Sequence, residues 1–169
     1  DVKEADSLQK YVDILENIIA KDTSKLLKLS YFSNKANLSD LRGNYFEAAL
    51  NYHKALEITP TDDSNNISTL YLNLATMYLN FDYPEKAATF IHKAIEIKGI
   101  QNFRIDQRNS IGVSQRKSKQ FAAAEETFLK IIEEALQKDL SYVLAQTYSN
   151  LGNVYLDQKA FDKATEVYA

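Results

Sequence analysis

The 169-residue sequence contains no cysteine and no tryptophan, and it has only four glycines and two prolines. The absence of cysteine excludes disulfide bonds, a thiol nucleophile and thiolate metal ligands. It is compatible with both a cytoplasmic and an exported protein, so the compartment stays unknown. The scarcity of glycine and proline, the residues that most often interrupt helices, favours an all-helical chain.

Features of membrane-spanning and nucleic-acid-binding proteins are also missing. No apolar run approaches the roughly 20 residues that a membrane-spanning helix needs, and the chain has neither an initiator Met nor a signal-like start. Its 20 basic and 23 acidic residues give a net charge of −3. This balance and the lack of a basic stripe leave no electrostatic footprint for nucleic acid.

A pattern of small and large residues occurs four times along the chain. It is centred on alanines spaced 39, 37 and 40 residues apart: Ala48, Ala87, Ala124 and Ala164. A small residue lies twelve positions before each of them: Ala36, Ala75, Gly112 and Gly152. A large one lies four positions after each: Tyr52, Ile91, Phe128 and Tyr168. Small residues let two helices approach and large ones fill the remaining space, so the pattern predicts stacked helical hairpins.

At these residues the sequence resembles the tetratricopeptide-repeat (TPR) family, whose pattern runs Leu-Gly-x-x-Tyr, Ala-x-x-x-Phe, Ala and Pro. The fourth copy fits best, with Leu151, Gly152, Tyr155, Phe161, Ala164 and Tyr168. The resemblance covers about residues 28–169. It implies an all-α fold, a right-handed α-solenoid of antiparallel helix hairpins. The spacing exceeds the family's usual repeat of about 34 residues, so we expect longer helices or connections.

The resemblance divides the chain into five segments. Residues 1–27 are expected to form a capping helix or a degenerate repeat, because stretch 5–20 is amphipathic but lacks the repeat signature. The other segments are TPR 1 at 28–66, TPR 2 at 67–103, a divergent TPR 3 at 104–138 and TPR 4 at 139–169. The fourth repeat is truncated in its second helix at Ala169. We therefore expect the chain to be a piece of a larger protein.

The first helix of each hairpin lines the concave wall in this family, and the resemblance places function there. The residues expected to face this groove are Asn34, Asn37, Asn73, Thr76, Ser110, Val113, Asn150 and Asn153, with Arg116 extending it. Asn34, Asn73 and Asn150 occupy one position in three of the four copies. A carboxamide offers donors and an acceptor that match an extended peptide backbone. We predict an asparagine ladder; the alternative is a tolerated polar residue on a solvated helix face.

The family's carboxylate clamp is not expected in this chain. The clamp uses Lys and Arg to grip the C-terminal carboxylate of a chaperone tail, and its basic positions hold Ser33, Asp106 and Ser110 here. Without these cations the charge-assisted hydrogen bonds to a terminal carboxylate are missing.

Catalytic and metal-binding residues are not expected either. His53 and His92 recur at the same place in two copies, but no acidic third ligand recurs with them. Ser114 in the stretch "GVSQR" lacks the second glycine of a nucleophile elbow. We therefore predict that the chain is not an enzyme and holds no cofactor and no metal.

The sequence thus predicts a scaffold that binds a protein or peptide partner, with no nucleic acid contacted and no membrane span. The alternative is the sensor or regulatory region of a larger bacterial signal-transduction protein, a transcription regulator or histidine kinase. Long-repeat arrays resemble those of such proteins. A third hypothesis is self-association through the stacking face at residues 161–168, which the pattern leaves uncovered.

Overall fold

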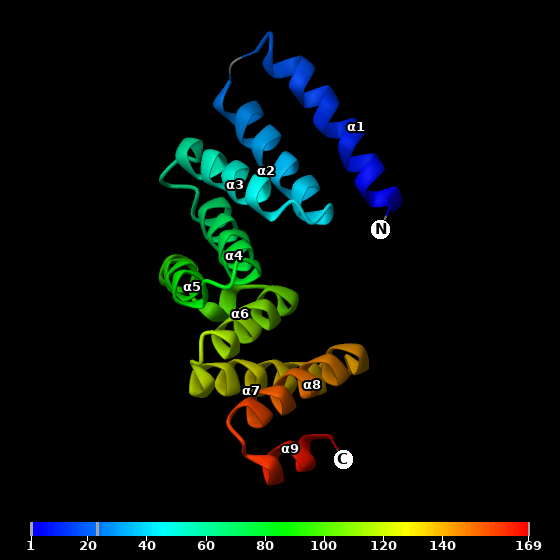
Figure 1. The fold of residues 1–169 in the computed structure, drawn as a ribbon, viewed down its shortest axis with the longest axis vertical. Coiled ribbons are helices and arrows are strands. Elements are labelled where there is room, and N and C mark those ends of the chain that lie inside the picture. Colours follow the sequence, from blue (N-terminus) through cyan, green and yellow to red (C-terminus); the bar gives the residue numbers. More distant parts are fainter. Residues whose placement is uncertain (1, 23, 169) are drawn as a thin grey trace. The chain divides into compact units, whose positions relative to one another are not determined.

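The computed structural model describes residues 2–22 and 24–168, in which the regular elements are all helices and none is a strand (Figure 1). Ala169, where the sequence pattern stops, lies outside the described residues. The elements are α1 (Val2–Ile19), α2 (Lys25–Leu41), α3 (Tyr45–Ile58), α4 (Ser64–Asn80), α5 (Pro84–Lys98), a short 3₁₀ helix η1 (Ile100–Asn102), α6 (Ile105–Lys117), α7 (Phe121–Gln137), α8 (Ser141–Asp157) and α9 (Phe161–Tyr168).

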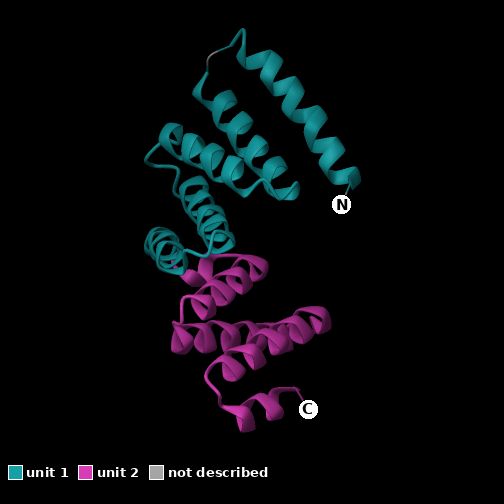
Figure 2. Cartoon of the chain, in the orientation of Figure 1, with its two compact units in different colours: residues 1–98 teal, residues 99–169 magenta. Residues whose placement is uncertain are grey.

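The helices fall into two compact units, shown in different colours in Figure 2. Unit 1 comprises residues 1–98 and holds α1 to α5, and unit 2 comprises residues 99–169 and holds η1 and α6 to α9. Within each unit every α-helix packs against the next one along the chain. The hairpins are α2–α3 and α4–α5 in unit 1, and α6–α7 and α8–α9 in unit 2.

Each hairpin turns through the same backbone motif. Seven residues after the small residue of each copy, the chain adopts a left-handed conformation with φ between 59° and 75°, at Gly43, Asp82, Lys119 and Lys159. The next amide donates back across five residues, as from Gln120 to the Gln115 carbonyl at 2.8 Å. This Schellman arrangement satisfies carbonyls that the helix end leaves open, and glycine suits it best. Only the first hairpin has glycine there.

Replacing Lys119 with glycine should therefore stabilise unit 2 by about 0.5–1 kcal/mol, because the cost of a left-handed side-chain-bearing residue exceeds glycine's added chain entropy. Urea unfolding followed by circular dichroism measures the change. Lys130→Gly, in the middle of α7, is the matched control and should destabilise by about 1 kcal/mol. A destabilising Lys119→Gly would contradict this account of the turn.

The small and large residues of each copy lie on the two helices of a hairpin, and in unit 2 they pack against each other. They lie sixteen positions apart, and the pairs are Ala36–Tyr52, Ala75–Ile91, Gly112–Phe128 and Gly152–Tyr168. A Cβ atom added to Gly112 would lie 2.6 Å from Cε1 of Phe128, and one added to Gly152 would also meet the ring of Tyr168. These glycines therefore let an aromatic ring rest directly on the backbone of the first helix.

The amphipathic face predicted for residues 5–20 packs against the first hairpin. Val12 and Leu15 of α1 are buried with Tyr31 and Leu38 of α2, and Leu8 and Ile19 flank them. The hydroxyl of Tyr31 also donates to Oε1 of Glu16 at 3.0 Å. The side chains of α1 thus complete the core beside α2, although the helix carries no repeat signature.

Candidate functional site

The predicted groove residues all lie on the first helices of the hairpins. Asn34 and Asn37 are on α2, Asn73 and Thr76 on α4, Ser110, Val113 and Arg116 on α6, and Asn150 and Asn153 on α8. Helices α2 and α4 belong to unit 1, and α6 and α8 belong to unit 2.

On α2 the two asparagines have different partners. Nδ2 of Asn34 donates to the Ser30 carbonyl of its own helix at 2.7 Å, so this amide is turned along the helix. Oδ1 of Asn37 accepts a hydrogen bond from the Tyr52 hydroxyl at 2.7 Å. Its amide nitrogen makes no hydrogen bond within the described part of the chain. Asn37 is exposed and keeps both N–H donors for a ligand.

On α4 the side chain of Asn73 is partly buried, and no hydrogen-bond partner for it occurs among residues 2–22 and 24–168. Thr76, one turn further on, donates its hydroxyl to the Leu72 carbonyl at 3.2 Å. Asn73 therefore has unused hydrogen-bonding capacity, whereas the Thr76 donor is occupied within the helix.

In unit 2 the asparagines join a network between α6 and α8. Nδ2 of Asn150 donates to Oδ1 of Asn109 at 3.1 Å, and Nδ2 of Asn109 lies 3.4 Å from Oγ1 of Thr147 and from Oε1 of Gln146. Asn109 is only 5% exposed. Buried polar groups need such partners, so one N–H of Asn150 serves to tie the two helices together.

Two further predicted residues of unit 2 also have partners inside the fold. Nη1 of Arg116 on α6 lies 3.3 Å from Oδ2 of Asp157 on α8. Oδ1 of Asn153 accepts from the Tyr168 hydroxyl at 3.3 Å. The predicted residues Asn150, Asn153 and Arg116 thus all have partners within unit 2, in contrast to Asn73 in unit 1.

The repeat pattern did not predict two residues, Asn109 and Asp40. It placed Ser110 at the groove position of the third copy, and the asparagine that pairs with Asn150 is its neighbour. The corresponding residues of the other copies are Ser33, Leu72 and Ser149, so no repetition marked it. Asp40 is not at one of the repeat positions expected to face the concave wall. The structure places it in a groove with α1, which the repeat pattern did not cover.

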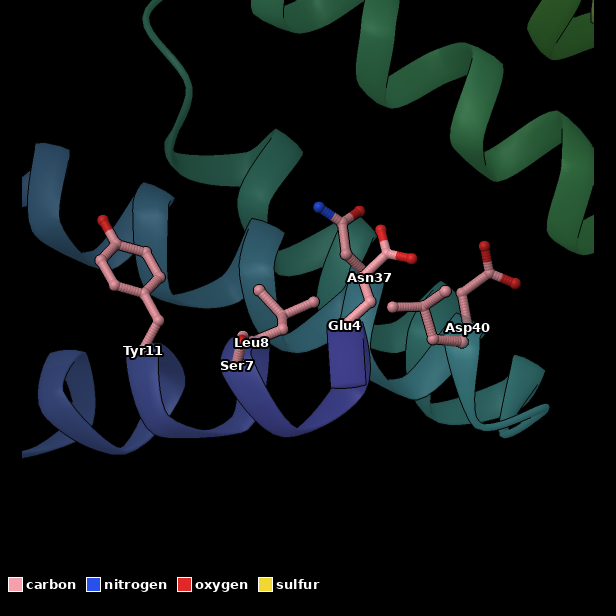
Figure 3. Close-up of a pocket in the computed structure, with 7 residues that line it drawn as sticks. Glu4, Ser7, Leu8, Tyr11, Asn37 and Asp40 are labelled. Carbon is pink, nitrogen blue, oxygen red and sulfur yellow. The ribbon is translucent and has the colours of Figure 1, made fainter. Parts of the chain in front are cut away.

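This groove lies between the first half of α1 and the last turn of α2, and it encloses about 780 Å³ (Figure 3). Its lining residues are Glu4, Ser7, Leu8, Tyr11, Asn37, Asp40 and Leu41. In the close-up the polar ends of Glu4, Asn37 and Asp40 are directed to the same side. The groove therefore combines carboxylates, an amide and apolar side chains.

The two histidines have unlike surroundings. His92 is exposed, with Nδ1 3.7 Å from Oε2 of Glu96. Nε2 of His53 lies 3.2 Å from the Tyr78 hydroxyl, and the ring packs edge-on against Tyr78 and Phe90. Burial, followed by the nearby Lys86 charge, lowers the pKa of His53 below its usual value. Among the described residues no group of three His, Cys, Asp or Glu could hold a metal ion.

Two surface features bear on the remaining predictions. No helix in the described ranges has the length and apolar character to cross a membrane. On α9, Phe161 and Tyr168 are 62% and 51% exposed, whereas Ala164 is buried. Self-association through this face stays a prediction.

Comparisons with known proteins agree with the hairpin architecture. Residues 68–100 and residues 144–169 each match a family model described as Tetratricopeptide repeat. The crystal structure of BtubC (BKLC) from P. vanneervenii is similar, with a TM-score of 0.76, 22% identity and coverage of 98% of this chain and 72% of that one. YrrB, described as a TPR protein with an unusual peptide-binding site, has a TM-score of 0.70, 17% identity and coverage of 98% and 77%. A search of the curated proteins found no match.

The hairpins and these structural similarities define the fold as an all-α helical-repeat solenoid. Within it, the matched stretches, residues 68–100 and 144–169, are tetratricopeptide repeats. Proteins of this family are interaction modules whose fold is typically a non-catalytic scaffold, and the chain is an interaction module of this class.

Proposed function

We propose that the chain binds an extended segment of a protein partner along the first helices of its hairpins, with Asn73 as the central contact in unit 1. The observation that carries this proposal is the partly buried Asn73 amide without a partner in the described chain. A polar group in such a place gains a full hydrogen bond when a ligand supplies one. A peptide backbone offers both the carbonyl and the N–H that a carboxamide can pair with.

The predicted asparagine ladder takes a narrower form in this proposal. Asn34 has one N–H turned to its own helix, and Asn150 has one turned to Asn109. Nδ2 of Asn34 also lies 3.4 Å from Oγ of Ser30, so Asn34 and Asn150 each contribute at most part of the bidentate contact available at Asn73. YrrB, which has the same fold, is described as having a peptide-binding site, and this similarity of fold supports the proposal.

Replacing Asn73 with alanine should weaken peptide binding about tenfold, because two hydrogen bonds of ordinary strength are lost. Peptides would first be selected on the wild-type chain from a random display library, and their affinities for each variant measured by calorimetry. The free energy of unfolding should change by no more than about 0.5 kcal/mol, since Asn73 has no partner within the fold.

Asn80→Ala is the matched control, because Asn80 is an exposed asparagine at the end of the same helix. Its affinity for the selected peptides should equal that of the wild type. Equal affinities of the Asn73 and Asn80 variants would show that Asn73 is not part of the binding site. Failure of the wild-type chain to select any peptide would refute the peptide-binding function itself.

Under the sensor-region hypothesis the chain uses the same binding surface. The scaffold and sensor hypotheses differ in which further domains the same polypeptide contains. The complete sequence of the parent protein would decide between the two roles. A DNA-binding or histidine-kinase module in the same polypeptide would support sensing, and its absence would support a plain scaffold.

A further inference from the structure

The groove between α1 and α2 contains two carboxylates without counter-charges. Asp40 and Glu4 both line it, and neither carboxylate has a hydrogen-bond or ion-pair partner among residues 2–22 and 24–168. In unit 2, by contrast, the carboxylate of Asp157 is paired with Arg116. Both carboxylates can therefore accept hydrogen bonds from a cation that enters this groove.

The position of Asp40 is electrostatically unfavourable for an unpaired carboxylate. It lies in the last turn of α2, a turn that contains no basic residue, where the partial negative charge of the helix end repels it. Burial raises the pKa of Asp40 above its usual value, and no nearby cation opposes this effect. A cation in the groove would relieve both costs and gain a charge-assisted hydrogen bond.

The rest of the lining suits a peptide that carries the cation. The amide nitrogen of Asn37 is free to donate to a backbone carbonyl, because only its oxygen is used by Tyr52. Tyr11 and Leu41 are each 46% exposed, and they line the groove together with Leu8. These side chains can cover the apolar stem of a long basic residue or an apolar neighbour of it.

We propose that this groove binds a lysine or arginine side chain of an extended partner segment, with Asp40 and Glu4 receiving the cation and Asn37 the backbone. The inference rests on the proposed function, peptide binding, and adds the chemistry of the partner. A metal ion fits the groove less well, because the described residues provide no third acidic or histidine ligand there. A basic, partly apolar segment satisfies the carboxylates, the amide and the apolar lining together.

The test uses peptides selected on the wild-type chain from a library of random nonapeptides. The selected sequences should be enriched in Lys or Arg, and replacing that residue with glutamine in a synthetic peptide should weaken binding about 10- to 100-fold. Asp40→Asn should reduce the affinity of the basic peptide by a similar factor and leave that of the glutamine peptide unchanged. Glu4→Gln should act in the same direction.

Asp6→Asn is the matched control, since it removes the same charge from an exposed position of α1 that does not line the groove. It should leave the affinity unchanged, and circular dichroism should show that all three variants fold. Peptides without basic residues, or equal effects of Asp40→Asn and Asp6→Asn, would overturn the inference while leaving peptide binding intact. Failure to select any peptide would overturn the proposed function and this inference with it.

Discussion

Replacing Phe128 with alanine is expected to lower the free energy of unfolding by about 3–5 kcal/mol, the range for deletion of a fully buried aromatic side chain. Phe128 is 0% exposed and is the largest fully buried side chain of the described chain. It lies in one cluster with Ile131, Leu151 and Val154 and against Gly112, so its removal leaves a cavity that residues from α6, α7 and α8 line. Urea unfolding followed by circular dichroism measures the loss.

Phe46→Ala is the matched control, because the same side chain is 77% exposed at the start of α3. Its effect should stay within about 0.5 kcal/mol, as for most surface substitutions. In a helical-repeat protein each repeat contacts only its neighbours, so hydrogen exchange should show the loss at Phe128 first in α6, α7 and α8. Similar losses for the two variants would mean that Phe128 is not part of a packed core.

The hairpins could be predicted from the sequence because their packing repeats. Ala75 and Ile91, or Gly112 and Phe128, recur at one fixed separation, and this separation is imposed by two helices that cross at the same point in each copy. Helix α1 was predicted from its amphipathic face for the same reason, since Val12 and Leu15 follow the period of a helix. Packing contacts that repeat along the fold are therefore visible as a repeating pattern in the sequence.

The polar contacts of the candidate site do not produce a repeating pattern in the sequence. Asn150 pairs with Asn109 over a separation of 41 residues and off the repeat position, so no spacing indicates the pair. Lys119 adopts a left-handed conformation that a lysine does not suggest. The groove of Asp40 depends on α1, which lies outside the repeat pattern. Such contacts depend on where two particular helices meet. A residue that occurs in only one copy of the repeat gives no sign of that contact in its local sequence.

Replacing Gly112 with alanine is the second substitution with a large expected effect. The new Cβ would lie 2.6 Å from Cε1 and 2.7 Å from Cζ of Phe128, a ring that is fully buried. Overpacking of this kind costs about 1–3 kcal/mol, and alanine regains about 1 kcal/mol of helix propensity over glycine. We expect a net loss of up to about 2 kcal/mol in the free energy of unfolding.

A second substitution should reverse that loss, because the chain already contains the compatible pair. Ala75 and Ile91 occupy the same two positions in the second repeat, and they are 1% and 2% exposed. The double variant Gly112→Ala, Phe128→Ile should therefore be more stable than the sum of the two single effects predicts, with a coupling of about 1 kcal/mol or more, as expected for residues in contact. Urea unfolding of the wild type, both single variants and the double variant gives this coupling directly. Additive effects would show that the helix crossing moves freely to accept a Cβ, and that the small and large positions of a repeat are not chosen together.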